Sequence, residues 1–259
     1  MYPITRPKWS PFLLDNISQR AESAHALRRL TVKYSDALIR VRRSSDNNEQ
    51  DISFNSEGFL DTVSLLNFVG ANDGFISKWY DQSSNRFPVN QAIAANQAKI
   101  VSSGTLNTSN SKPTVSFLKS SSQWLDNSNP LPVLASYAVA SYNSATYLDF
   151  DGICTDTGVT VLGILGDDGT TNLYQPNSSF YVNGAITAVT PMSNSLFIVS
   201  QRSTNGIQQW VGVNIGKHAI LSFRTWNGNI SEALNFSTYD DATRRLIEQN
   251  QGRYYGITI

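Results

Sequence analysis

The sequence predicts a mainly β protein, a two-sheet sandwich with a few short helices. From about residue 75 onward, short apolar runs alternate with segments rich in Gly, Asn, Asp, Ser and Pro, which is typical of strands joined by turns. Asn183 and Gly184 interrupt one of these runs, and both residue types tolerate positive φ, which favours a tight hairpin. The chain has 259 residues, 40% of them hydrophobic, which is enough for the core of one large sandwich.

The chain begins with an extended segment. Residues 1–14, MYPITRPKWSPFLL, contain three prolines, which remove backbone donors and favour extended backbone. We expect an arm over 1–14, either a strap over the domain or an attachment to a partner subunit, and a single domain over 15–259. The segment lacks the cationic start and apolar run of a secretory signal, so no classical export signal is expected.

Two helices are predicted before the strands. The first covers about 15–30, because apolar residues recur there at helical spacing after a capping Asp15 or Asn16. His25 lies beside that stripe and is expected to be structural. A second, short helix follows Asp61 and ends at Gly70.

Eight strands and a last helix follow. The strands are predicted at 75–80, 113–118, 136–142, 160–165, 179–186, 196–202, 220–226 and 230–236. Thr238 and Asp241 then resemble a capping box that begins a C-terminal helix.

Charge and ligand counts exclude several function classes. Twenty basic and twenty acidic residues cancel, whereas a dedicated nucleic-acid binder usually has a basic excess. No apolar run reaches the roughly 18 residues of a membrane helix, so no membrane insertion is expected. Cys154 is the only cysteine, and His25 and His218 are the only histidines, which leaves zinc short of ligands.

Four segments in order resemble one family. AHALRRL (24–30), IRVRRSSDNNEQDISF (39–54), FVGANDGFISKWYDQSSN (68–85) and QAKIVSSG (97–104) resemble the arabinofuranosidase B-like concanavalin A-type domains, over about residues 13–118. SFYVNG and the segment 226–257 are similar to the wider laminin-G and concanavalin A group. The resemblance implies a concanavalin A-like two-sheet jelly roll.

Such domains recur in bacteriophage tail and fibre proteins, which leads to the functional prediction. We expect a non-catalytic virion component, a tail, tail-fibre or head-fibre protein, assembled in the host cytoplasm and exposed on the particle. Its loops would bind a host-surface glycan, and residues 1–14 would attach it to other virion proteins. A homotrimer is expected because fibres usually form one. An architectural capsid or tail decoration protein without a ligand is an alternative.

A glycoside hydrolase of the arabinofuranosidase type is the other alternative. Hydrolysis normally needs two carboxyl groups roughly 5–10 Å apart. Of five glutamates, Glu232 lies in a motif that non-catalytic relatives also carry. The arabinofuranosidases of the resemblance carry an adjacent cysteine pair near the sugar, and nothing equivalent occurs here. Because neither the family's nucleophile nor its acid can be placed, the sequence predicts no enzyme activity.

Sugar binding needs an exposed aromatic side chain beside amide or carboxylate groups. The candidate carbohydrate-binding residues are therefore Trp124 with Gln123, Asp126 and Asn127, then Trp226 with Asn227, and Trp210.

No cofactor is expected, with Ca²⁺ as the alternative at two acidic turns. Asp149 and Asp151 precede Gly152, and Asp167 and Asp168 precede Gly169. Calcium prefers oxygen-rich loops, but Asp-Gly pairs are also ordinary turn formers.

The basic cluster RVRRSSDNNEQD is interpreted as an internally paired structural motif. Its members are Arg40, Arg42, Arg43, Asp46, Glu49 and Asp51. Arginine pairs with carboxylates through two parallel hydrogen bonds, and SSDNN has the composition of a turn that would bring them together.

Overall fold

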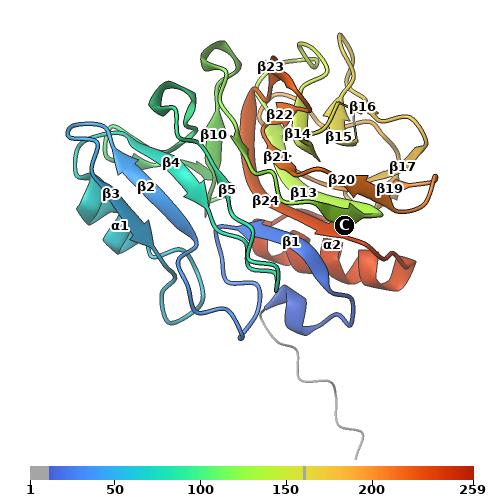
Figure 1. Ribbon diagram of the computed structural model, residues 1–259, viewed down its shortest axis with the longest axis horizontal. Helices are drawn as coiled ribbons and strands as arrows, with labels where there is room; N and C mark the ends of the chain where they lie inside the picture. The colour runs from blue at the N-terminus through green and yellow to red at the C-terminus, as the bar shows by residue number, and fades with distance from the viewer. Residues whose placement is uncertain (1–11, 160–161) are drawn as a thin grey trace, which may run out of the picture.

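The computed structural model describes residues 12–159 and 162–259, which form an antiparallel β sandwich with two α-helices (Figure 1). The predicted mainly β, jelly-roll class is confirmed. Eight of the observed strands, or strand pairs joined by a hairpin, coincide with the eight predicted strands. The hairpin at Asn183 and Gly184 is also observed, with φ of 49° and 82° at the two residues.

One run of paired strands is built around the two longest strands. Its order is β18–β17–β19–β13–β24–β1, with all neighbours antiparallel. The bounds are β1 (Ala21–Ala26), β13 (Ala135–Tyr142), β17 (Ser178–Val182), β18 (Ala185–Ile186), β19 (Phe197–Ser203) and β24 (Gly228–Phe236).

The second run has the order β3–β2–β4–β5–β11–β21–β14–β15–β16. Its bounds are β2 (Ile39–Arg43), β3 (Glu49–Ile52), β4 (Gly74–Trp79), β5 (Val89–Asn90), β11 (Leu125–Asp126), β14 (Gly152–Asp156), β15 (Gly163–Gly166), β16 (Leu173–Tyr174) and β21 (Val213–Ile215).

Short strands join the two runs or form small ribbons. β10 (Val115–Phe117) pairs with both β24 and β6 (Lys99–Ser102), and β6 pairs in turn with β4 and β7 (Thr105–Leu106). The ribbons are β8 (Thr108–Ser109) with β9 (Lys112–Pro113), β12 (Leu131–Val133) with β20 (Gln208–Trp210), and β22 (Lys217–His218) with β23 (Leu221–Thr225). Two further 3₁₀ turns are η2 (Ala94–Asn96) and η3 (Lys119–Ser121).

The main core lies between the two runs. One hydrophobic cluster contains Trp79 of β4, Ala138 of β13 and Cys154 of β14, all fully buried. Because both sheets contribute to one cluster, strands distant in sequence are held in a fixed relation at the sandwich edges.

Two predicted helices are confirmed. α1 (Thr62–Val69) follows Asp61, whose side chain accepts the Ser64 amide at 3.0 Å, and ends at Gly70. α2 (Asp241–Tyr255) packs on the outer face of the first run, where Figure 1 shows it alongside β24 and β13. Its cap is Asp240, not Thr238 as predicted. Neither helix of the described residues is long and apolar enough to cross a membrane.

The predicted helix over 15–30 is wrong. The structure has a 3₁₀ turn, η1 (Leu13–Asp15), followed by β1, which pairs with β24. Five of the six β1 residues are buried, so this strand has no polar face whose spacing could distinguish it from a helix. Of the predicted arm, residues 1–11 lie outside the described residues, and Leu13 is buried.

Candidate functional site

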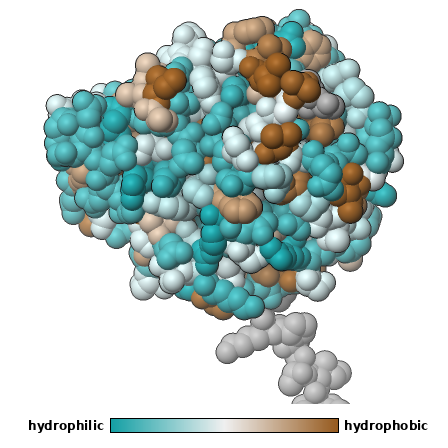
Figure 2. Space-filling model, viewed as in Figure 1, coloured by the Kyte–Doolittle hydropathy of each residue, from teal (hydrophilic) through white to brown (hydrophobic). Residues whose placement is uncertain are grey.

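A hollow of about 380 Å³ lies at one end of the sandwich, beside β15, β16, β22 and β23. It is lined by Phe150, Leu165, Tyr174, Pro176, His218 and Arg224, and we call it the His218 hollow. Figure 2 shows apolar surface gathered over this end of the molecule. The side chains of Phe150 and Tyr174 contact each other, with ring centroids 5.4 Å apart. The hollow therefore offers aromatic surface together with two nitrogen-bearing side chains.

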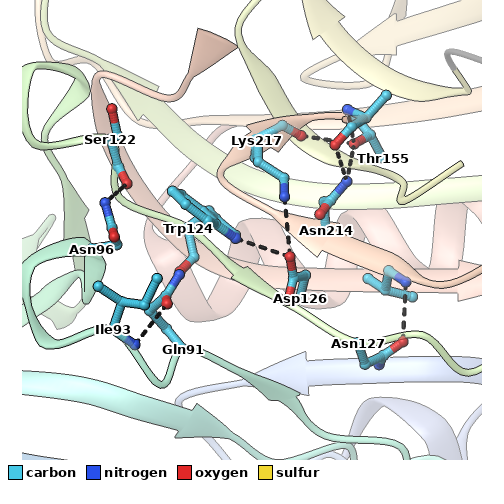
Figure 3. Close-up of polar contacts among 12 residues, drawn as sticks. Gln91, Ile93, Asn96, Ser122, Trp124, Asp126, Asn127, Thr155, Asn214 and Lys217 are labelled. Carbon is cyan, nitrogen blue, oxygen red and sulfur yellow. Dashed lines mark hydrogen bonds and ion pairs between the residues drawn. The ribbon is translucent and has the colours of Figure 1, made fainter. Parts of the chain in front are cut away.

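His218 is positioned by the close approach of β14 to β22. A Cβ at Gly152 would lie 2.2 Å from the Lys217 carbonyl oxygen, so only glycine permits this spacing. The Thr155 hydroxyl donates to the same carbonyl at 2.7 Å, and the Asn214 side chain donates to the Ala219 carbonyl at 3.0 Å. Figure 3 shows Thr155 and Asn214 beside the backbone of Lys217. This buried network fixes the corner that carries His218.

His218 is a buried imidazole in the wall of the hollow. Its side chain is almost fully buried, and its Nδ1 atom has no hydrogen-bond partner among the residues that the structure describes. Burial, and then the charge of Arg224, lower the pKa of His218. The imidazole is therefore neutral near pH 7 and can donate or accept a hydrogen bond to a hydroxyl group.

Asp149 supplies a carboxylate beside the hollow. Its Oδ1 atom lies 3.0 Å from Nε of Arg224 and also accepts the Phe150 amide at 2.8 Å. The Arg224 guanidinium lies over the Phe150 ring, 5.1 Å from its centroid. The side chain of Asp149 is 23% exposed, so the carboxylate reaches solvent at the edge of the hollow.

Asp151 is the second carboxyl group, and it is fully buried. The Lys119 ammonium and the Tyr142 hydroxyl bind its two oxygen atoms. Burial raises the pKa of Asp151 to about 6, although the contacts with Lys119 and Tyr142 oppose that shift. Tyr142 packs against Trp226 with ring centroids 4.8 Å apart, so an aromatic cluster excludes water from this carboxyl group.

The predicted metal ligands do not form a metal centre in the described part of the chain. Asp149 and Asp151 are engaged by Arg224 and Lys119, and no group of three His, Cys, Asp or Glu side chains that could hold an ion occurs among the described residues. Asp167 and Asp168 lie in the turn after β15, at the surface of the same end of the sandwich. The sequence marks Asp149 and Asp151 as candidate metal ligands, whereas in the structure each carboxylate binds a cationic side chain.

The residues around Trp124 mostly hold the structure together. The Trp124 indole donates to Asp126 at 2.9 Å, and Lys217 lies over its ring, 4.6 Å from the centroid (Figure 3). Gln123 accepts the Leu118 amide. Asn127 donates its side-chain amide to two backbone carbonyls and accepts from the Val213 amide. Lys217 therefore occupies one face of the indole.

The other predicted tryptophans are not exposed platforms. Trp226 is 0% exposed and belongs to the aromatic cluster behind Asp151, so the prediction is wrong for it. Asn227 is partly exposed, and its backbone carbonyl accepts the Asn143 amide. Trp210 is 2% exposed, but it lines a second hollow described below.

The basic cluster lies on β2 and β3, at the other end of the fold from the His218 hollow (Figure 1). Arg40 binds Asp51 through two bonds of 2.7 and 2.8 Å, and Arg43 binds Asp46.

The remaining members of that cluster differ. Arg42 donates to the amide oxygens of Gln97 and Asn47 at 2.7 and 2.8 Å. Glu49, on β3, is exposed. The arginines of the cluster are therefore paired with side-chain amide oxygens as well as with carboxylates.

Sequence reasoning missed most of the residues that line the hollow. His218, Arg224, Phe150 and Tyr174 come from segments that only the sandwich brings together, and no local motif marks them. The one sequence feature that could have drawn attention to His218 is that the chain has only two histidines.

The chain is similar to known arabinofuranosidases. Residues 19–120, less than half of the chain, match the family model described as alpha-L-arabinofuranosidase B, catalytic. Of the residues that line the His218 hollow or bind Asp149 or Asp151 through their side chains, only Lys119 lies in that segment. No curated protein sequence matches.

Solved structures extend the similarity in fold. An arabinofuranosidase complexed with arabinofuranosyl-α-1,2-xylobiose has a TM-score of 0.64 at 16% identity, covering 93% of this chain and 64% of that chain. A GH54 α-L-arabinofuranosidase soaked with a cyclic sulfate inhibitor has a TM-score of 0.62 with the same identity and coverage. This chain thus spans less than two thirds of the length of the proteins it matches.

These comparisons correct the functional prediction. The sequence predicted a non-catalytic bacteriophage component, and nothing in the comparisons supports that origin. The matching family model is that of a catalytic domain, and the matching structures are arabinofuranosidases, which overturns the expectation that the chain is not an enzyme. The attachment through residues 1–14, the homotrimer and the location on a particle stay predictions. The chain is similar in fold, over 93% of its residues, to α-L-arabinofuranosidases.

Proposed function

We propose that this chain is a glycoside hydrolase domain that acts on α-L-arabinofuranosides, with the His218 hollow as its active site. The observation that carries the proposal is the pair Asp149 and Asp151, two carboxyl groups of different environment that flank Phe150, a residue of the wall of the hollow. The likeness in fold to arabinofuranosidases supports the choice of sugar.

The two carboxyl groups suit the two tasks of glycoside hydrolysis. One group must protonate the glycosidic oxygen as the bond to the anomeric carbon breaks, and a second must act as base toward water or as nucleophile. Asp151, with its pKa raised to about 6 by burial, can hold a proton in mildly acidic solution. Asp149, paired with Arg224 and partly exposed, is the carboxylate that a substrate would meet.

His218 and the aromatic side chains would bind the sugar. Phe150 and Tyr174 offer apolar surface to the sugar ring, and the imidazole of His218, whose Nδ1 is buried, forms the wall beside them.

The covering of Asp151 sets a requirement for this mechanism. Lys119 and Tyr142 occupy both of its oxygen atoms, so a proton reaches the substrate only when Lys119 moves away. The Lys119 side chain is 21% exposed, so it can swing toward solvent. We expect Lys119→Ala to keep hydrolysis, because it opens the path to Asp151.

The test is the release of 4-nitrophenol from 4-nitrophenyl α-L-arabinofuranoside, together with arabinose release from arabinofuranosyl-xylobiose. Removing a general acid or base costs roughly 100-fold to 10,000-fold. Asp149→Asn and Asp151→Asn should each lower kcat/KM at least about 100-fold. Asp168→Asn is the matched control, since Asp168 is exposed in a nearby turn, and it should leave kcat/KM unchanged.

Two results would refute the proposal. The first is that the wild-type chain binds the arabinofuranoside but releases no product over many hours. The second is that product forms but Asp149→Asn and Asp168→Asn are equally active, which would place the chemistry elsewhere.

A further inference from the structure

A second hollow, of about 240 Å³, lies on the other side of the segment that follows β16. It shares Pro176 with the His218 hollow, and strands β12, β15, β17, β19 and β20 contribute to its wall. We call it the Trp210 hollow after the largest side chain that lines it. Trp210 is held in place there because β20 pairs with β12, with Trp210 opposite Leu131.

Among the residues that the structure describes, none with an ionisable side chain lines the Trp210 hollow. Its polar part consists of amide and hydroxyl groups, which include Gln175, Ser178, Gln201, Ser203, Asn205 and Gln208. Such groups can each donate and accept hydrogen bonds, as sugar hydroxyls do. Anions and metal ions are disfavoured as ligands, because this wall has no cationic side chain to pair with an anion and no carboxylate to bind a metal ion.

Several of these side chains are already fixed by one another. Gln201 Nε2 donates to the Ser178 hydroxyl at 2.7 Å, which leaves its amide oxygen and its second N–H for a ligand. Gln208 Nε2 donates to the Gly206 carbonyl at 3.0 Å and to the Ser203 hydroxyl at 3.3 Å. Because the donors are held before a ligand arrives, binding would cost little side-chain entropy.

We propose that the Trp210 hollow binds one uncharged sugar ring. The partly exposed Leu134 and Leu162 supply apolar surface for the ring's C–H groups beside the buried Trp210 indole, and the amides and hydroxyls bind its hydroxyl groups. The volume of about 240 Å³ is below the roughly 300–1,000 Å³ of pockets for drug-sized ligands, which fits a single ring. This inference does not depend on hydrolysis at the His218 hollow.

The experiment follows the intrinsic tryptophan fluorescence of the full chain during titration with L-arabinose, D-xylose, D-galactose and D-glucuronate. At least one neutral sugar should change the fluorescence with a dissociation constant on the order of 1 mM, which is typical of weak single-ring binding. Glucuronate, which carries a carboxylate, should give no saturable change.

Variants locate the binding. Trp210→Phe should abolish the change, and Gln201→Leu should weaken binding at least about 10-fold while keeping the reporter tryptophan. Trp124→Phe is the matched control, because Trp124 lies outside the hollow and should leave binding unchanged. If Trp210→Phe fails to fold, Gln201→Leu alone decides, measured by isothermal titration with the melting temperature as a check on the fold.

The outcomes separate the two hollows. Asp149→Asn should keep this binding even when it loses hydrolysis. The inference is overturned when no neutral sugar saturates, which would mean that the hollow holds only water, or when Asp149→Asn abolishes binding and Gln201→Leu does not.

Discussion

The ion pair between Arg28 and Glu232 gives the sharpest stability prediction. Nε of Arg28 lies 2.9 Å from Oε2 of Glu232, and the two side chains are 4% and 0% exposed. Gln251 donates to the other carboxylate oxygen at 3.1 Å, and the Arg28 guanidinium lies 4.4 Å from the ring centroid of Tyr254. The pair therefore connects the end of β1, the long strand β24 and α2 in a site without water access.

The magnitude follows from this burial. Arg28→Ala leaves a carboxylate buried without its cation, which costs about 3–5 kcal/mol of unfolding free energy. Glu232→Gln leaves the guanidinium buried but keeps one acceptor oxygen, so its cost should fall near about 3 kcal/mol. The double variant Arg28→Met with Glu232→Leu removes both charges, and such replacements are often neutral or stabilising by about 1–4 kcal/mol. The double variant should thus be more stable than either single variant.

Equilibrium unfolding in urea measures all three variants. Arg245→Ala is the control, because Arg245 pairs with Asp241 at the exposed surface and should cost at most about 1 kcal/mol. Glu232→Gln should also keep arabinofuranoside hydrolysis per folded molecule, since Glu232 does not line the His218 hollow. If Arg28→Ala costs no more than Arg245→Ala, or if the double variant is the least stable, the reasoning from burial is wrong.

Three further predictions concern pH and the basic cluster. His25 is fully buried, and burial lowers its pKa against the opposing charge of a nearby aspartate, so the stability it contributes is complete above about pH 6.5 and falls on acidification by up to about 1.4 kcal/mol per pH unit. His25→Phe should therefore make the urea midpoint less dependent on pH between pH 7 and 5, and an unchanged dependence would contradict this. Burial raises the pKa of Asp151 to about 6, so the stability it contributes is complete below pH 3.8 and is lost as pH rises through about 6, a loss of about 3 kcal/mol. Asp151→Asn should remove this pH dependence of the unfolding free energy, measured at pH 4 and pH 7. Arg42→Ala leaves the buried Gln97 side-chain oxygen unpaired and should lower the free energy of unfolding by about 1–3 kcal/mol. Arg40→Ala breaks an exposed ion pair and should lower it by at most about 1 kcal/mol, so equal melting temperatures of the two variants would refute the reasoning.

Most strand positions can be predicted from the sequence, because the features that indicate a strand are local. Alternating apolar runs, turn residues and the hairpin at Asn183 and Gly184 all depend on neighbours along the chain, and the structure has strands at each predicted run. The prediction is wrong at β1, where Ala21 and Ala24 fit the predicted helical stripe as well as a buried strand. Only the pairing of β1 with β24, more than 200 residues away, decided between them.

The site was harder to predict because its parts are distant in sequence. Asp149 and Asp151 are recognisable in the sequence as an acidic turn, but no local pattern indicates that Lys119 and Arg224 bind them or that His218 lies nearby. Trp226 fits a sugar platform by composition, yet the fold places it in an aromatic cluster behind Asp151. Whether a tryptophan is exposed depends on long-range packing, which the residues next to it do not encode.

The central claim is that the His218 hollow hydrolyses α-L-arabinofuranosides with Asp149 as an essential carboxylate. The measurement that tests it most directly is the ratio of kcat/KM for 4-nitrophenyl α-L-arabinofuranoside between Asp149→Asn and Asp168→Asn, each verified as folded by its melting temperature. We predict a ratio of about 1:100 or smaller. A ratio near 1, or no release by the wild-type chain, would contradict the claim.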